Sequence, residues 1–455
     1  MTDVIVVGGG IAGLSAAYEL QAQGLSFVLL ERTTRPGGVI VSEEVDGYTI
    51  DGGPDSLLVQ KPEAIALCKE IGLADRLVPT KPPRLAFIQR GGRLHPLPAH
   101  SVLGIPTRIG PFVSTGLFSW AGKMRMAAEL FVPPRRDGAD ESIGSFMRRR
   151  FGEEATTYLA EPLLAGIHAG DVDRLSIKAL FPRLAETERT KGSLLAAFSR
   201  AAPSAASSDG AFRSLPGGLS EMVRALAAWL PPDALRFSTP VRRVLLAPAR
   251  VETHAGESLS ARAVIVTSPA YVAADLLRDQ NGDIARLCQD VRYASTATIA
   301  LAFPRSAVTH PLNGSGFVVP RVEGTGILAA SWLSSKWPHR APDDRVLMRA
   351  FFGGARDETA LQRSDAQLED VALSALRPLL GISGDPLLSR VYRFERASAQ
   401  HEVGHLARID ALDRILQRTP GLFMTGSGLR GVGIPDCVAD ARVTARKASE
   451  WLRHA

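Results

Sequence analysis

Cysteine and long apolar runs are both scarce in this chain of 455 residues. Its three cysteines, Cys68, Cys288 and Cys437, lie far apart and form no C-x-x-C pair. A disulfide framework or a zinc site is therefore not expected, and a reducing cytoplasm fits best. The nearest candidate for a membrane span, Ile109 to Gly122, has 14 uncharged residues and contains Pro111, whereas a spanning helix needs about 18 or more apolar residues. We expect no transmembrane helix.

Motifs for protein nucleophiles and metals are missing as well. The sequence has no H-E-x-x-H zinc motif, no G-x-S-x-G elbow and no clustered cysteine ligands, so neither a metal site nor a catalytic nucleophile is predicted. No basic region of a secretory signal precedes the first apolar run. The net charge of +6 suits an anionic substrate, an anionic membrane surface or a solvated basic surface. Nucleic acid is disfavoured, because no basic stripe interleaved with aromatic residues occurs.

The first 31 residues carry the clearest motif. An apolar run from Val4 to Val7 is typical of a buried strand, and a second run from Phe27 to Leu30 ends on the acid Glu31. Between them lie a glycine turn and a helical pattern from Leu14 to about Gln23. This order of strand, turn, helix, strand and acid matches the G-x-G-x-x-G motif of dinucleotide-binding folds. A glycine turn without a nucleotide is the plainer alternative, and the complete unit disfavours it.

Each glycine of the motif has its own physical role. Gly8 allows the tight turn, Gly10 lets the backbone approach a pyrophosphate, and Gly13 brings helix and strand close together. The helix N-terminus presents free N–H groups and partial positive charge to the phosphates, while Glu31 accepts hydrogen bonds from ribose hydroxyls. The predicted contacts of this unit are Gly8, Gly9, Gly10, Ile11, Ala12, Gly13, Glu31 and Arg32.

A second glycine pair, Gly37-Gly38, follows the acid, and a turn cluster covers Asp51 to Ser56. A nicotinamide cofactor needs no second approach of the backbone, whereas a flavin threads its ribityl chain past this point. The pair therefore favours a flavin dinucleotide over nicotinamide.

Together these segments resemble the flavin-containing amine oxidase superfamily and, within it, the oxygen-dependent porphyrinogen oxidases of haem biosynthesis. Three later segments support the narrower resemblance: EPLLAGIHAGD from Glu161, LPGGL from Leu215 and TGSGLRGVGIPDC from Thr425. They occur in the expected order across nearly the whole chain. Another member of the superfamily, such as an amine oxidase or carotenoid desaturase, and a non-catalytic protein of the same fold stay open as alternatives.

The resemblance implies a non-covalent FAD whose N5 atom performs the chemistry, so no catalytic side chain is predicted. The substrate would be protoporphyrinogen IX or coproporphyrinogen III, oxidised by six electrons, with molecular oxygen as acceptor and hydrogen peroxide as by-product. A ferrochelatase could then receive the product. The further cofactor contacts implied are Gly37, Gly38, Val39, Gly53, Pro54, Asp55, Ser56, Val241, Gly426, Ser427, Val432, Gly433 and Ile434.

Four residues are expected at the substrate. Arg84 stands where the family has an arginine near a propionate, and a guanidinium offers that carboxylate a permanently charged, bidentate partner. Gly166 matches a position of close approach to the tetrapyrrole, and Ile299 and Phe351 are expected to form apolar walls. One departure concerns the segment from Ala399 to His405, which lacks the Pro and Tyr usual in the family.

The predicted fold is α/β with three parts. A discontinuous Rossmann-like FAD-binding domain takes residues 1–83, 206–285 and 410–455, a mixed-sheet substrate domain takes 84–95 and 286–409, and a helical lobe takes 96–205. In the lobe, Lys123 to Phe131 has Met124, Ala127, Ala128 and Phe131 on one helical face. That face predicts either peripheral contact with the inner side of a membrane or an ordinary core helix.

Overall fold

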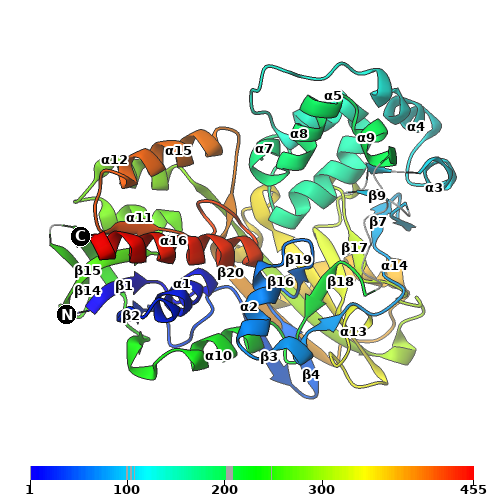
Figure 1. Ribbon diagram of the computed structural model, residues 1–455. Coiled ribbons are helices and arrows are strands. Elements are labelled where there is room, and N and C mark those ends of the chain that lie inside the picture. Colours follow the sequence, from blue (N-terminus) through cyan, green and yellow to red (C-terminus); the bar gives the residue numbers. More distant parts are fainter. Residues whose placement is uncertain are drawn as a thin grey trace.

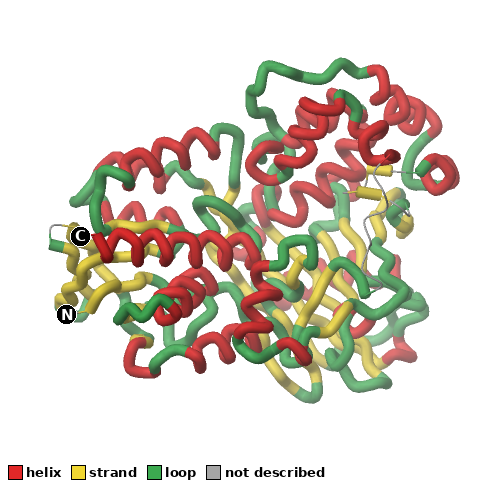
Figure 2. Tube along the Cα trace, viewed as in Figure 1, coloured by secondary structure: helices red, strands yellow, loops and turns green. Residues whose placement is uncertain are grey.

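A computed structural model describes residues 2–454 apart from 99–100, 103–104, 107, 201–208 and 247. Two sheet-based domains lie side by side, and a helical lobe stands over the second of them (Figure 1). Helices flank the first sheet on both sides, whereas the second part is dominated by strands (Figure 2). The predicted α/β fold with a mixed second sheet and a helical lobe is confirmed. The exact domain boundaries stay a prediction.

The first sheet is the predicted nucleotide-binding half. In spatial order its strands are β12 (Leu235–Arg236), β2 (Phe27–Leu30), β1 (Thr2–Val7), β15 (Ser258–Val266), β14 (Ala249–Thr253) and β13 (Val241–Leu246), with β21 (Leu422–Met424) also paired to β15. The strands from β12 to β15, together with β21, are parallel, and β13 and β14 are antiparallel. Val4 to Val7 are all buried, as expected for a parallel strand covered on both faces.

Helices cover both faces of this sheet (Figure 1). One core joins the sheet to α1 (Ile11–Ala22), α2 (Glu63–Glu70), α10 (Ser220–Trp229) and α16 (Ile434–His454). The opposite core joins it to α11 (Ala270–Leu277), α12 (Gly282–Gln289) and α15 (His405–Leu416). The first and last helices pack against each other, so the two ends of the chain build one domain.

The second sheet is almost entirely antiparallel. In spatial order its strands are β20 (Leu388–Gln400), β16 (Arg292–Pro304), β19 (Arg345–Gly353), β18 (Ala329–Trp332), β17 (Gly316–Val318), β7 (Phe87–Arg90) and β8 (Arg93–Pro96). Only β17 and β7 are parallel. One face packs on α14 (Asp365–Leu380), whose start is fixed by a capping box of Ser364 and Gln367. The other face meets the hairpin of β3 (Ser42–Val45) and β4 (Tyr48–Asp51).

The lobe packs its helices around a core of its own. It contains α3 (Ile109–Ser114), α4 (Trp120–Ala127), α5 (Ile143–Phe151), α6 (Glu153–Ala155), the π-helical η3 (Thr156–Ala165), α7 (Ile177–Leu180), α8 (Pro182–Lys191) and α9 (Leu194–Arg200). Inside it the fully buried Arg150 pairs with Glu129 and Glu188, and Glu129 also accepts the N–H of Leu194 at 2.9 Å. Within the described ranges, no helix is long and apolar enough to cross a membrane.

The remaining elements are short connections. The strands are β5 (Leu57–Leu58), β6 (Val78–Pro79), β9 (Ser101–Val102), β10 (Ile105–Pro106) and β11 (Phe212–Ser214). The helical turns are η1 (Ala74–Arg76), η2 (Ala128–Phe131), η4 (Gly166–His168), η5 (Pro232–Ala234), η6 (Arg305–Ala307), η7 (Arg321–Glu323), α13 (Leu333–Lys336), η8 (Gly354–Arg356) and η9 (Ala360–Gln362).

Candidate cofactor and substrate site

The first glycine turn lies at the carboxyl end of β1, directly before α1. Gly8 has φ +112°, a conformation that residues with a side chain rarely adopt. A Cβ on Gly13 would overlap the carbonyl oxygen of Gly8, so helix and strand can approach this closely only without a side chain there. A Cβ on Gly10, in contrast, would meet no atom within 4 Å. The turn therefore leaves open space beside the N-terminus of α1, which is what a pyrophosphate needs.

The second glycine pair lies against the first turn. The N–H of Gly37 donates to the carbonyl of Gly9 at 2.8 Å, and Gly10 and Gly37 form a parallel bridge. Gly37 and Gly38 have φ values of +102° and +58°, and a Cβ on Gly38 would lie 3.4 Å from the Cα of Gly10. Two glycine motifs separated along the chain thus form one cradle.

Glu31 is buried beneath this cradle. One carboxylate oxygen accepts the N–H of Gly9 at 2.7 Å, and the other accepts the N–H and hydroxyl of Thr33 at 2.8 and 2.7 Å. A carboxylate offers about four acceptor positions, so capacity for a ribose hydroxyl remains. The carbonyl of Glu31 accepts the N–H of Thr239 at 2.8 Å, two residues before Val241, one of the predicted cofactor contacts.

The C-terminal glycine segment reaches the same sheet edge through a residue that the sequence did not reveal. Thr267 follows β15, and its hydroxyl donates to the carbonyls of Val7 and Gly8 at 3.0 and 3.1 Å. A Cβ on Gly426 would lie 3.0 Å from the carbonyl oxygen of Thr267. Thr267 therefore lies between the first and last glycine turns, and α16 begins at Ile434 beside them. No local pattern marks Thr267, because the carbonyls that it contacts belong to Val7 and Gly8, far along the chain.

The loop from Gly52 to Ser56 connects this cradle to the second sheet. A Cβ on Gly53 would overlap the carbonyl oxygen of Val39, while the side chain of Val39 is 44% exposed. The carboxylate of Asp55 pairs with Lys336 at 2.8 Å and with Arg349 at 3.6 Å. Burial alone would raise the pKa of Asp55, but these two cations hold it well below its usual range. The Asp55 side chain is thus committed to the domain junction, and its carbonyl accepts the hydroxyl of Ser214 at 2.8 Å, which leaves its backbone N–H for the predicted cofactor contact.

The two predicted wall residues lie on opposite faces of the second sheet. Phe351 is half-buried on β19, with its ring 4.6 Å from the guanidinium carbon of Arg349, and Arg349 donates to the carbonyl of Gly53 at 2.6 Å. Ile299 pairs with Ala350 and is buried in the core against α14. Ile299 and Phe351 therefore point to opposite sides of the sheet, because neighbouring positions of a strand alternate between faces. Their role as apolar walls for the substrate stays a prediction.

Thr298 is the residue that shares the face of Phe351. It lies directly opposite Phe351 in the β16–β19 ladder, and its hydroxyl donates to the carbonyl of Gly52 at 2.8 Å. The alternation of side chains along β16 would predict that Thr298 shares a face with Phe351 once the pairing of β16 with β19 is known. The sequence alone does not give that pairing.

Arg84 lies in the segment before β7, and Gly166 begins η4 in the lobe. The Nε of Arg84 donates to the backbone carbonyl and hydroxyl oxygens of Thr80 at 3.1 and 3.2 Å, and a Cβ on Gly210 would come within 2.7 Å of that guanidinium. Gly166 follows the π-helical η3, and a Cβ there would meet nothing closer than 3.6 Å. Its neighbour Ile167 is 70% exposed, an apolar side chain that the sequence analysis did not single out.

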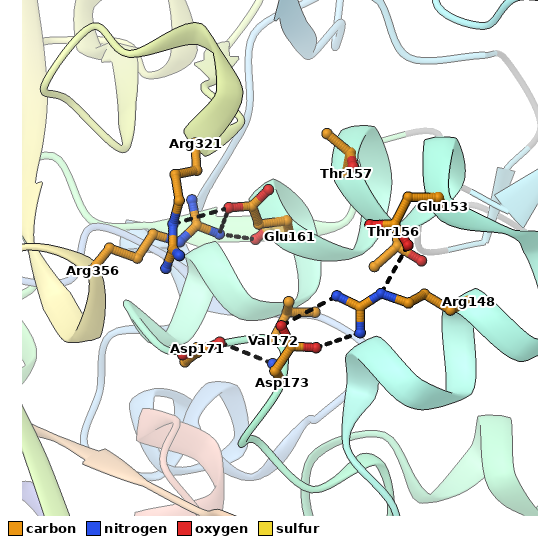
Figure 3. Close-up of a pocket in the computed structure, with 10 residues that line it drawn as sticks. All are labelled: Arg148, Glu153, Thr156, Thr157, Glu161, Asp171, Val172, Asp173, Arg321 and Arg356. Carbon is orange, nitrogen blue, oxygen red and sulfur yellow. Dashed lines mark hydrogen bonds and ion pairs between the residues drawn. The ribbon is translucent and has the colours of Figure 1, made fainter.

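A cavity of about 160 Å³ lies between the lobe and the second domain (Figure 3). Glu161 of η3 meets Arg356 at 3.0 Å and Arg321 at 3.6 Å, while Arg148 pairs with Glu153 and Asp173. Three arginines and four acids line this cavity, so one acidic charge is in excess. The ion pairs of Glu161 thus connect the lobe to the second domain about one helical turn before Gly166.

The comparisons with known proteins agree with this geometry. The family model for flavin containing amine oxidoreductases matches residues 11–449, and the chain belongs to this family. It is a flavin-dependent oxidoreductase, as the glycine cradle indicates.

The relatives are porphyrinogen oxidases by name. Coproporphyrinogen III oxidase of Bacillus subtilis (strain 168) is 36% identical, and the match covers 99% of this chain and 98% of that protein. The chloroplastic protoporphyrinogen oxidase of Nicotiana tabacum is 29% identical over 99% and 86% of the two chains. Among solved structures, a putative protoporphyrinogen oxidase from Exiguobacterium sp. 255-15 has a TM-score of 0.89 with 32% identity, covering 99% of both chains.

We predict that Gly10→Ala lowers FAD affinity without unfolding the apoprotein. The added methyl group meets no protein atom within 4 Å, but it enters the space reserved for the pyrophosphate. The dissociation constant for FAD, measured by fluorescence titration of apoprotein, should rise at least about tenfold, roughly the loss of one or two charged hydrogen bonds.

The matched control is Gly282→Ala, at the start of α12, where a Cβ also meets nothing within 4 Å. It should bind FAD as the parent protein does. An unchanged affinity in Gly10→Ala would contradict the assignment of the cradle.

Proposed function

We propose that this chain is an FAD-dependent oxidase that converts a porphyrinogen to the porphyrin in haem biosynthesis. The observation that carries the proposal is the extent of the similarity to porphyrinogen oxidases. The match covers 99% of the chain at 36% identity, so it includes the second sheet and the lobe, which select the substrate, as well as the dinucleotide cradle. Structures of putrescine oxidase, at 16% identity and a TM-score of 0.69, share the fold only.

Coproporphyrinogen III is the proposed preferred substrate. Three coproporphyrinogen III oxidases match at 33–36% identity, whereas the chloroplastic protoporphyrinogen oxidases match at 28–30%. Coproporphyrinogen III carries four propionates, whereas protoporphyrinogen IX carries two propionates and two vinyl groups.

A bound flavin accepts two electrons in each cycle. Three cycles remove six electrons, and three molecules of oxygen, as the proposed acceptor, leave as hydrogen peroxide. The protein's own part is to bind and orient. Arg84 would hold a propionate, Gly166 would allow the backbone to approach the macrocycle, and Phe351 would offer an aromatic wall.

The proposal includes non-covalent binding of FAD. Cys437 is the cysteine nearest the C-terminal glycine segment, and it is 5% exposed. Burial raises the pKa of its thiol to about 12, so it stays protonated and a poor nucleophile. The flavin should accordingly leave the protein on acid precipitation.

Turnover of both porphyrinogens tests the function directly. We predict that porphyrin fluorescence rises with either substrate under air and that kcat/KM is at least about tenfold higher for coproporphyrinogen III, as expected when extra carboxylates find charged partners. Oxygen consumption, measured in parallel, tests whether molecular oxygen is the electron acceptor. A preference for protoporphyrinogen IX would overturn the choice of substrate, and no turnover of either would overturn the function.

Arg84→Ala should raise KM for the porphyrinogen about tenfold or more while the flavin content stays unchanged. The reason is the loss of a charged partner for a propionate, typically worth about 1.5–3 kcal/mol. Steady-state kinetics and the ratio of flavin to protein absorbance measure the two quantities. Arg93→Ala, in the β7–β8 hairpin, is the matched control. An unchanged KM in Arg84→Ala would remove Arg84 from the substrate site.

Peripheral membrane contact is proposed for the tip of the lobe. The predicted apolar face is exposed instead of buried: Met124 is 69% and Phe131 86% exposed, with Trp120 at 68% beside them. Arg108 and Arg136, in the segments that flank this stretch of the chain, are exposed, and a combination of cations and aromatic side chains suits an anionic lipid surface. The core-helix alternative is wrong for this face. Hand-off of the product to a ferrochelatase stays part of the proposal.

Vesicle sedimentation tests the contact. The protein should sediment with vesicles that contain phosphatidylglycerol, and the double variant Trp120→Ser/Phe131→Ser should lose most of this binding. Trp229→Ser, which changes a tryptophan 51% exposed on α10, should bind as before. Equal binding by all three proteins would contradict the assignment.

A further inference from the structure

Two histidines occupy the turn that leads from the second sheet back to the first domain. His401 follows β20 and His405 begins α15, and they are 2% and 1% exposed. Their rings are stacked, with centroids 3.8 Å apart and an angle of 12° between the planes. His401 lies in the segment where the sequence departs from the family pattern, so its role here has to come from this chain's own contacts.

Both imidazoles reach the C-terminal glycine segment. Nε2 of His401 lies 3.1 Å from the carbonyl oxygen of Ser427, and Nε2 of His405 lies 2.7 Å from that of Leu429. A carbonyl oxygen can only accept, so each ring must carry its proton on Nε2. Nδ1 of His405 is buried and has no partner among the described residues. Among the described residues, the imidazole of His405 therefore makes one hydrogen bond, to the carbonyl of Leu429.

These two contacts fix the direction of two peptide groups. In a trans peptide the C=O and the following N–H point in opposite directions. Holding the carbonyls of Ser427 and Leu429 toward α15 therefore turns the N–H groups of Gly428 and Arg430 the other way. Neither N–H has a hydrogen-bond partner within the described part of the chain. The turn thus keeps donors free while its carbonyls are held.

Within the turn, the N–H of Leu429 donates to the carbonyl of Gly426 at 3.0 Å, and further contacts hold the segment at its ends. Thr425 donates its N–H to Val266 at 3.0 Å and its hydroxyl to Asp440 at 2.6 Å, and Arg430 pairs with Asp413. Between these anchors the histidines are the side chains that hold the backbone carbonyls. Burial lowers the pKa of His401 to about 3 and that of His405 to about 4, so both stay neutral and can stack without repulsion.

We propose that His401 and His405 are positioning residues, which as a stacked pair hold the Ser427–Leu429 turn in the conformation that closes on the flavin. The inference requires flavin binding, which the family establishes, but not the identity of the substrate. Its test therefore measures FAD and not porphyrinogen turnover.

The test compares substitutions that keep or remove the Nε2–H donor. Gln places an amide N–H near the position of Nε2, whereas Leu has a similar bulk and no donor. His405→Leu should raise the dissociation constant for FAD about tenfold and shift the flavin midpoint potential, since it leaves the carbonyl of Leu429 without the donor that holds it. His405→Gln should restore both to within about threefold of the parent, because it keeps the donor.

His401→Leu and His401→Gln give the same comparison should His405→Leu fail to fold. His310→Leu is the control outside the site: it removes a partly buried imidazole whose Nδ1 accepts the N–H of Leu312 at 3.0 Å. It should lower the melting temperature without changing FAD affinity. If the Leu variants at 401 or 405 lose thermal stability but keep the parent affinity and potential, or if Gln rescues nothing, the pair is a structural brace only and the proposal is overturned.

Discussion

The close approach of backbone to backbone at the carboxyl edge of the first sheet is the constraint on which the rest of the structure depends. A side chain at Gly13 would overlap the carbonyl of Gly8, and one at Gly53 would overlap that of Val39. Backbones this close present N–H groups and helix ends to a ligand in place of side chains. The cradle therefore depends on the absence of side chains at these glycines, and the packing of the surrounding cores keeps its backbone segments in place.

Two sets of buried polar contacts hold this edge from the side of the second domain. Arg340 pairs with Asp51 at 2.8 Å, and Arg349 reaches Asp55 and the carbonyl of Gly53. Thr298 adds a hydrogen bond to Gly52. These groups lie away from water, where charges are stable only when paired. The loop that carries the predicted flavin contacts is thus tied to the second domain by these contacts.

The lobe contacts the second domain through η3 and carries exposed aromatic side chains elsewhere. Its π-helical segment ends at Gly166, and the carboxylate of Glu161 on that segment meets two arginines of the second domain. A π-helix widens the turn and is commonly found at functional sites. The exposed aromatic tip lies at the opposite end of the lobe from the first domain (Figure 1). One end of the lobe thus contacts the second domain, and the other carries exposed aromatic side chains.

The sequence by itself determined the elements whose signal is local. The run from Val4 to Glu31 specifies strand, turn, helix and acid through apolar periodicity and glycine, and both depend only on neighbours in the chain. The flavin followed from the second glycine pair, and the family followed from motifs in order. Arg84 and Gly166 were named through resemblance, and their roles remain to be tested.

Only the tertiary structure decided which distant residues share a face or a contact. Ile299 and Phe351 both look apolar on strands, yet strand pairing sends them to opposite faces. Thr267 and the histidines at 401 and 405 act through segments far along the chain, so no local pattern marks them. Sheet register and the packing of the first helix on the last depend on residues far apart in the sequence, because they are determined by which apolar faces are buried against each other.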